Sequence, residues 1–466
     1  MKIKNRSYSA GRVFVTLVIV CLVNGTLAGA AETDPSGTIP ILSAEAAVRE
    51  ALENNPDLAS LEARSRQAAS TARASEADRL PRLSANAAST HFTDPMRVRP
   101  PTANNQAATF SPDLWQANLS LNWTLYSGGR LSATAEADRL LAASAGEDVR
   151  FFRQRLATRV AQLYFEYAAF KAIIAASEKS LASLREQENR IQQLLEQGKA
   201  AEVDKMRLQV RSASVEQLLI QQRNERTTLH ATLNFLIGRP LDNAWECEAR
   251  YHESALTAAA DMGQSMDGQP VAVRGDLTAA RYRVEAAQAG IEQARAAFRP
   301  DLQLIAEWGP RGDWQDREQY EQGFIGFGLN WNLWDGGSRK ARLQGARELE
   351  RARLAEERSL SENRRLEIIT ARKNLEAARE RLDVMQLSTR TAAESLRIEQ
   401  NKYMEGKGTI IDILDAETAA LETESLYQRA QADVRTSLAA LDLALGNALS
   451  PRAQCTCLGL NFEPSP

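Results

Sequence analysis

The feature that most limits the fold is a strand-like segment that occurs twice, as LNWTLYSGGR at residues 121–130 and as LNWNLWDGGS at residues 329–338. The offset between the two copies is 329 − 121 = 208. Apolar and polar residues alternate in both, which predicts a strand with one apolar face. This face comprises Ala117, Leu119, Leu121, Trp123 and Leu125 in the first copy, and Ile325, Phe327, Leu329, Trp331 and Leu333 in the second. The chain is therefore expected to contain two copies of one structural unit.

A second extended segment precedes each of these strands. It reads LPRLSANAAST at residues 80–90 and FRPDLQLIAEW at residues 298–308, with a proline where a helix must stop. The offset between Pro81 and Pro300 is 300 − 81 = 219, which exceeds the offset between the later strands. The loop that joins the two segments is therefore longer in the first copy, by 219 − 208 = 11. We expect barrel-type strands over about 81–92, 115–126, 300–308 and 323–334.

Long helices are expected after each Gly-Gly turn. Residues 131–197 and 339–405 are rich in Ala, Leu, Glu, Arg and Gln and contain no proline. At 1.5 Å per residue, each helix would be roughly 100 Å long. Each ends at a Gly-Lys pair, near residues 198 and 406, and a second helix then returns. The chain is thus predicted to be mainly α with a small β portion, in which each repeat forms helix, strand, strand, long helix and helix.

The domain boundaries follow from this repeat. We expect a first repeat over residues 31–245, a linking segment over 246–267, a second repeat over 268–450 and a C-terminal tail over 451–466. The Ala and Leu stripes of the helical hairpins are interpreted as coiled-coil packing faces.

The N-terminus has the pattern of a secretory signal peptide. Basic residues between Lys2 and Arg12 precede an apolar run over 13–23 and the sequence Ala-Gly-Ala, which predicts removal of residues 1–30. The apolar run is shorter than the roughly 20 residues of a membrane-spanning helix. Removal of four basic residues changes the formal charge from −3 to −7. The exported chain is acidic, so nucleic acid is not an expected partner.

The alternating strands suit either a soluble β-sandwich or a membrane barrel, and two copies in an exported helical chain favour the barrel. A closed barrel satisfies all its backbone hydrogen bonds in lipid, and its strands show about ten residues of alternation. Two strand pairs supply four strands, whereas the smallest closed membrane barrel has about eight. Several chains must therefore contribute to one barrel.

The duplicated strand–Gly-Gly–helix order, the Gly-Lys tips and the ending ALG at 444–446 resemble the TolC-like outer-membrane efflux channel family. The resemblance covers essentially all of the exported chain. It implies a homotrimer with a twelve-stranded β-barrel in outer-membrane lipid and a coiled-coil α-helical tunnel through the periplasm.

The resemblance also implies a function. The protein would be the passive exit duct of a tripartite efflux or type I secretion system, docked on a periplasmic adaptor (membrane fusion) protein and an inner-membrane RND or ABC pump. No enzyme activity and no cofactor are expected. The alternative is a structural stalk protein of the envelope, which would not need the alternating strands twice.

The closed end of the tunnel is implied at the helical tips. In KYMEGKGTIIDILDAETA, residues 402–419, the family's paired Asp residues fall on Asp412 and Asp415. Because they are three positions apart, they share a helix face, and the resemblance implies acidic rings that favour cations. The alternative is that Thr409 and Asp412 form a capping box, with the acids stabilising a first helical turn.

The resemblance further implies a closure network at Tyr403 and, in the first tip, Asp204. The family's tip arginine is replaced by Gly408, which leaves Lys407 as the nearest cation. The alternatives are a packing role for the tyrosine and a solvated first-turn position for Asp204.

The exported chain contains Cys247, Cys455 and Cys457, and the offset between the first two is 455 − 247 = 208, the same as between the repeated strands. Because the periplasm is oxidising, a disulfide from Cys247 to Cys455 or Cys457 is one prediction, and free thiols are the other. No metal site is expected, because none of the histidines (His91, His230 and His252) is near the Cys-x-Cys pair in sequence.

Overall fold

The computed structural model describes residues 40–93, 97–98, 108–109, 112–247, 273–313 and 319–447. Its elements lie in the unit that begins at Ile41. The first repeat contains α1 (Ala44–Asn54), α2 (Pro56–Ala77), β2 (Arg82–His91), β5 (Asp113–Tyr126), α3 (Arg130–Glu196) and α4 (Glu202–Ile237). The second contains α6 (Gly275–Ala296), β7 (Asp301–Asp313), β8 (Gln319–Asn330), α7 (Ser338–Met404) and α8 (Ile410–Leu445). Short strands are β1 (Ile41–Leu42), β3 (Arg97–Val98), β4 (Ala108–Thr109) and β6 (Glu246–Cys247).

The two repeats have helices of equal length. α3 and α7 each have 67 residues, and α4 and α8 each have 36. The starts of both pairs differ by the offset of the repeated strands, since 338 − 130 = 208 and 410 − 202 = 208. α2 and α6 each have 22 residues, and their starts differ by 275 − 56 = 219. The difference between these offsets, 219 − 208 = 11, arises between the first helix and the Gly-Gly turn, where the sequence predicts a longer loop.

Four antiparallel strands form one sheet in the order β2-β5-β7-β8. The β5–β7 pair joins the two repeats, and β2 and β8 are the edges. Directly paired residues share a face, so the register places one apolar face across the sheet. Its members are Leu83, Ala85, Ala87, Ala117, Leu119, Leu121, Trp123, Leu302, Leu304, Ala306, Trp308, Ile325, Phe327 and Leu329.

The opposite face of the sheet is largely polar. Ser84 and Ser120 are hydrogen bonded at 3.2 Å, and Asn86 Nδ2 donates to Ser120 Oγ at 3.1 Å. Asn118 donates to Glu307 on the neighbouring strand. The sheet therefore separates an apolar surface from a hydrogen-bonded polar one.

The strand expected over 323–334 ends earlier, at Asn330. Its partner strand starts at Asp301, which pairs with Asn330, and Pro300 has no N–H to continue the ladder. Beyond this point side chains hold the segment, since Trp331 Nε1 donates to the carbonyl of Phe298 at 3.3 Å. Polar–apolar alternation continues past the last available ladder partner, and so it overestimates the strand.

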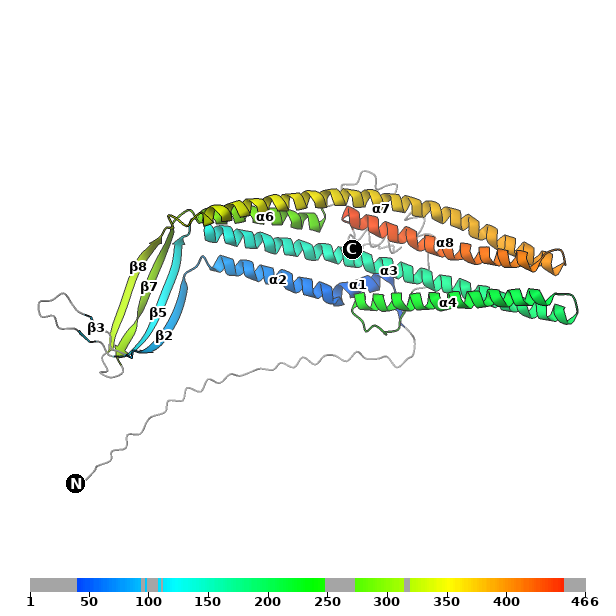
Figure 1. Cartoon of the computed structure of the whole chain (residues 1–466), viewed down its shortest axis with the longest axis horizontal. Helices are drawn as coiled ribbons and strands as arrows, with labels where there is room; N and C mark the ends of the chain where they lie inside the picture. The colour runs from blue at the N-terminus through cyan, green and yellow to red at the C-terminus, as the bar shows by residue number, and fades with distance from the viewer. Residues whose placement is uncertain are drawn as a thin grey trace, which may run out of the picture. The chain divides into compact units, whose positions relative to one another are not determined.

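The helices lie side by side in one layer that extends from one end of the strands (Figure 1). Near the sheet the contacts run α2–α3–α6–α7, and towards the tips they run α4–α3–α8–α7. One edge of the layer is therefore formed by α2 and α4, and the other by α7. None of the described helices combines the length and the apolar composition that a membrane crossing requires.

Candidate functional site at the helical tips

Both hairpins turn through the same backbone motif. Gly198 and Gly406 have φ of 72° and 73°, a conformation that glycine adopts without steric cost. The next residue donates its N–H back into the helix, from Lys199 to Leu194 O and from Lys407 to Lys402 O, both at 2.8 Å. This is the Schellman ending of a helix. Because it occurs in both repeats, the two long helices end with the same local geometry.

The starts of the returning helices differ between the tips. Thr409 caps α8: its Oγ1 accepts from Asp412 N at 3.3 Å, and Asp412 Oδ2 accepts from Thr409 N at 3.0 Å. The hydroxyl of Thr409 also donates to Asp412 Oδ2 at 2.7 Å. This hydroxyl, followed by the Thr409 N–H, lowers the pKa of Asp412. The N-cap residue of α4, Ala201, makes no side-chain hydrogen bond.

The paired aspartates lie on the outer side of α8. Asp412 and Asp415 are exposed, whereas Ile410 and Ile413 are buried against α3 and α4. In the described part of the chain, Asp415 has no hydrogen bond or ion pair. The capping box thus explains the position of the Asp412 side chain within one chain. It gives no such explanation for Asp415.

Tyr403 and Asp204 lie on different hairpins and interact electrostatically. Tyr403 is half-buried in an apolar cluster that includes Ile191 and Ile410. Burial, and then the negative charge of Asp204, raise the pKa of the Tyr403 hydroxyl. Asp204 itself lies 3.7 Å from Arg207 on the next turn of α4. Asp204 therefore acts on Tyr403 electrostatically, while its ion pair is with Arg207.

Lys407 does not join this group. Its Nζ lies 2.8 Å from Glu405 Oε2 on its own turn. No ion pair links it to Asp204 within the described ranges. The structure therefore gives no support for Lys407 as a substitute for the missing tip arginine.

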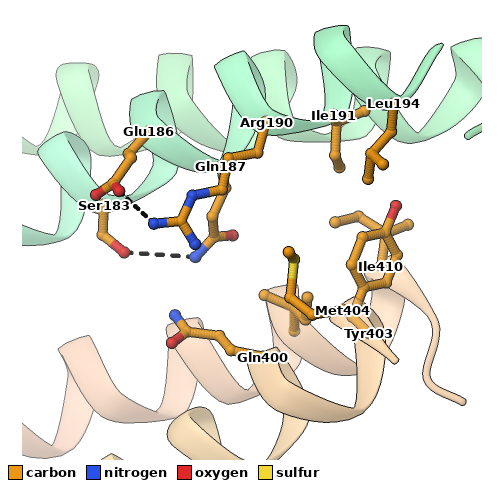
Figure 2. Close-up of a pocket in the computed structure, with 11 residues that line it drawn as sticks. Ser183, Glu186, Gln187, Arg190, Ile191, Leu194, Gln400, Tyr403, Met404 and Ile410 are labelled. Carbon is orange, nitrogen blue, oxygen red and sulfur yellow. Dashed lines mark hydrogen bonds and ion pairs between the residues drawn. The ribbon is translucent and has the colours of Figure 1, made fainter. Parts of the chain in front are cut away.

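A cavity of about 110 Å³ lies between α3 and the start of the second tip. Figure 2 shows Tyr403 and Met404 facing Ile191 and Leu194 across it. One wall is polar, where Arg190 pairs with Glu186 and Gln187 Nε2 donates to Ser183 Oγ at 3.4 Å. Residues of both hairpins thus line this cavity at the tip.

One residue near the tip was not expected from the sequence reasoning. Glu417 on α8 is only 3% exposed, and burial raises the pKa of its carboxyl. The sequence signal was available, since Ile413 and Leu421 lie one turn to either side on the same helical face. An acid in the middle of an apolar stripe predicts a buried carboxyl.

Cys247 lies in β6, where it pairs with Leu42 of β1. It is buried, and burial raises the pKa of its thiol. Cys455 and Cys457 lie outside the described residues, so the disulfide stays a prediction. In the described ranges, no group of His, Cys, Asp and Glu could hold a metal ion.

Comparisons with known proteins extend over most of the chain. A sequence model of the outer membrane efflux protein family matches residues 47–239 and 271–447. Nodulation protein T of Rhizobium leguminosarum bv. trifolii is 22% identical, over 87% of this chain and 86% of its own length. Outer membrane protein OprJ of Pseudomonas aeruginosa is 24% identical, over 85% and 82%. The crystal structure of the outer membrane protein VceC of Vibrio cholerae has a similar fold, with a TM-score of 0.73 at 23% identity over 86% of this chain and 96% of that one.

Proposed function

Because this chain belongs to the outer membrane efflux protein family, we propose that it is the exit duct of a tripartite efflux system. The protein is a TolC-like channel of the outer membrane that extends into the periplasm, and its role is not enzymatic. In the proposed system an inner-membrane RND or ABC pump delivers the substrate, and a periplasmic adaptor protein joins the pump to the helical tips. The same duct could serve type I secretion, in which the pump delivers a protein.

The observation that carries the proposal is the four-stranded sheet with two open edges. β2 and β8 leave backbone groups without ladder partners on their outer sides, a condition that lipid does not tolerate. Pairing of β8 with β2 of a neighbouring chain would satisfy them. Three chains would then supply 4 × 3 = 12 strands, with the apolar face towards lipid and the polar face towards the pore.

The outermost helices support the same arrangement. α7 buries Ala371, Leu375 and Ala378 against α8. On the opposite side of α7 five apolar side chains are exposed: Leu366, Ile369, Val384, Leu387 and Ile398. At 3.6 residues per turn they fall within an arc of about 60° around the helix axis. α4 likewise buries Leu208, Val215 and Leu219 and exposes Val203, Met206, Val210, Ile220 and Phe235. Helices with two apolar sides are typical of positions between neighbours, so α4 of one chain would contact α7 of the next.

Such a ring would bring the α8 helices of three chains together at the tip. Asp412 and Asp415 lie on the exposed side of α8, where the contacts within one chain leave them free to face the axis. Rings of carboxylates attract cations and favour their passage. Tyr403 and Asp204 would hold the two hairpins in the closed arrangement.

Planar bilayer recording tests the proposal. The purified protein should form cation-selective channels, and chemical cross-linking in cells should capture a trimer and an adaptor protein. Trimers that never conduct would instead indicate a structural stalk. Loss of drug resistance on gene deletion would favour efflux, and loss of a secreted protein would favour type I secretion.

A further inference from the structure

A buried carboxyl joins the two hairpins two turns from the tip. Glu417 on α8 accepts a hydrogen bond through Oε1 from Ser180 Oγ on α3, at 2.7 Å. Its second oxygen, Oε2, is buried and has no hydrogen-bond partner in the described part of the chain. Ser177 Oγ, one turn away on α3, is also buried and has no hydrogen-bond partner among the described residues. The interface therefore contains polar atoms that its packing does not satisfy.

The surroundings of this carboxyl are largely apolar. Ile413 and Leu421 flank it on α8 and pack against buried residues of α3 and α4. It also lines a cavity of about 560 Å³ between α3, α7 and α8. The packing between these helices is therefore incomplete beside the carboxyl.

Charged groups from the neighbouring elements lie near Glu417 but do not pair with it. Lys179 on α3 and Arg211 on α4 act on it electrostatically and favour its ionised form. Glu424 on α8 lines the same cavity and accepts from Gln428 Nε2 at 2.8 Å. The residues that α7 contributes to the cavity (Thr389, Ala393 and Leu396) carry no titratable group.

We propose that Glu417 is a proton-operated latch: in its neutral form it holds α8 against α3, and loss of its proton to water releases this contact and favours opening of the tip. The proposal rests on the channel function proposed above. An unpaired carboxylate in such a site is costly unless further partners compensate it. The ionised form therefore favours an arrangement in which α8 moves away from Ser180 and water reaches Oε2.

The sign of the pH dependence follows from the burial. Burial raises the pKa of Glu417 above the value of an exposed carboxyl, although Ser180, Arg211 and Lys179 act in the opposite direction. Closed packing is therefore favoured at low pH and weakens as pH rises through the raised pKa. Between the closed-state and open-state pKa values, the opening equilibrium should shift by up to about tenfold per pH unit for each chain.

Single-channel recordings of the full chain across a pH series test the latch. Wild-type open probability should rise with pH, and Glu417→Gln, which keeps the shape but cannot ionise, should stay closed throughout. Glu424→Gln is the matched control, because it removes an acid from the same cavity and should keep the wild-type profile. A Glu417→Gln variant with the wild-type pH profile would overturn the proposal.

Two further measurements test it independently of that variant's conductance. Ser180→Ala removes the contact that the neutral carboxyl makes with α3 in the closed arrangement, so the midpoint of opening should move to lower pH, and an unchanged midpoint would count against the latch. Infrared spectroscopy should detect a protonated carboxyl C=O band that persists above the pH at which exposed carboxyls titrate and that Glu417→Gln lacks. Identical spectra would refute the latch even in a protein that conducts, whereas a missing conductance with the expected band would refute only the channel function.

Discussion

Leu387→Glu should prevent the chain from forming a stable trimer. Leu387 is 70% exposed in the single chain and belongs to the outward apolar side of α7. In the proposed ring this side contacts α4 of the neighbouring chain. The substitution should leave each chain folded, because the side of α7 that packs on α8 is unchanged.

The size of the effect follows from the exposed side chain. Burial of a leucine stabilises a contact by about 1.5–3 kcal/mol, and an unpaired carboxylate placed there adds a penalty of several kcal/mol. A low figure of about 3 kcal/mol per interface gives about 3 × 3 = 9 kcal/mol for a ring with three interfaces. This corresponds to a roughly millionfold weaker assembly.

Size-exclusion chromatography with light scattering, in detergent, measures the oligomer directly. Asn374→Glu is the matched control: it is exposed on the same helix but points about 140° away, towards the groove over α8. The control should remain trimeric. A Leu387→Glu protein as trimeric as the control would show that the outward side of α7 is not an interface.

Further outcomes are expected from the tip, the cysteines and the strand–helix turns. Replacing Asp412 and Asp415 together by Ala should reduce cation selectivity and multivalent-cation block in single-channel recordings, and unchanged selectivity would place both outside the pore. Because the pKa of Asp412 is lowered, its cap should be present above the ordinary carboxyl pKa and lost as pH falls through the lowered value, which amide exchange at the start of α8 would detect. Non-reduced peptide mapping should find Cys247 linked to a C-terminal cysteine, whereas thiol labelling of every cysteine in the folded protein would rule the bond out. Gly128→Ala should lower the melting temperature more than Gly336→Ala, although both glycines have positive φ. A Cβ at Gly128 would lie 2.7 Å from the Arg299 side chain, whereas one at Gly336 would meet nothing within 4 Å. Equal losses of stability would contradict this.

The fold was predictable to the extent that it depends on local patterns. The constant offset between the repeats predicts paired helices, because the helical periodicity and the Gly-Lys pairs that end the helices lie within the sequences of those helices. The end of β8 was not predictable in this way. It depends on where the partner strand begins, and pairing between repeats is a property of the assembled sheet.

At the tip, too, local sequence patterns predict some of the site, but not the interactions between the hairpins. The spacing of Thr409 and Asp412 predicts the capping box, which is local. The grouping of Tyr403 with Asp204 required the resemblance, because the two residues lie on different hairpins. Glu417 required a further step, namely the recognition that an acid between two buried apolar positions must itself be buried.

The pairing of β5 with β7 has an evolutionary consequence. It joins the last strand of one repeat to the first strand of the next, which is the same kind of contact that β8 would make with β2 of a neighbouring chain. In a ring of three chains, every second junction between repeats would lie within one polypeptide. An ancestor with a single repeat could have formed the same ring from twice as many subunits, and gene duplication would then have allowed the two hairpins to diverge, so that only one of the returning helices now begins with a side-chain cap.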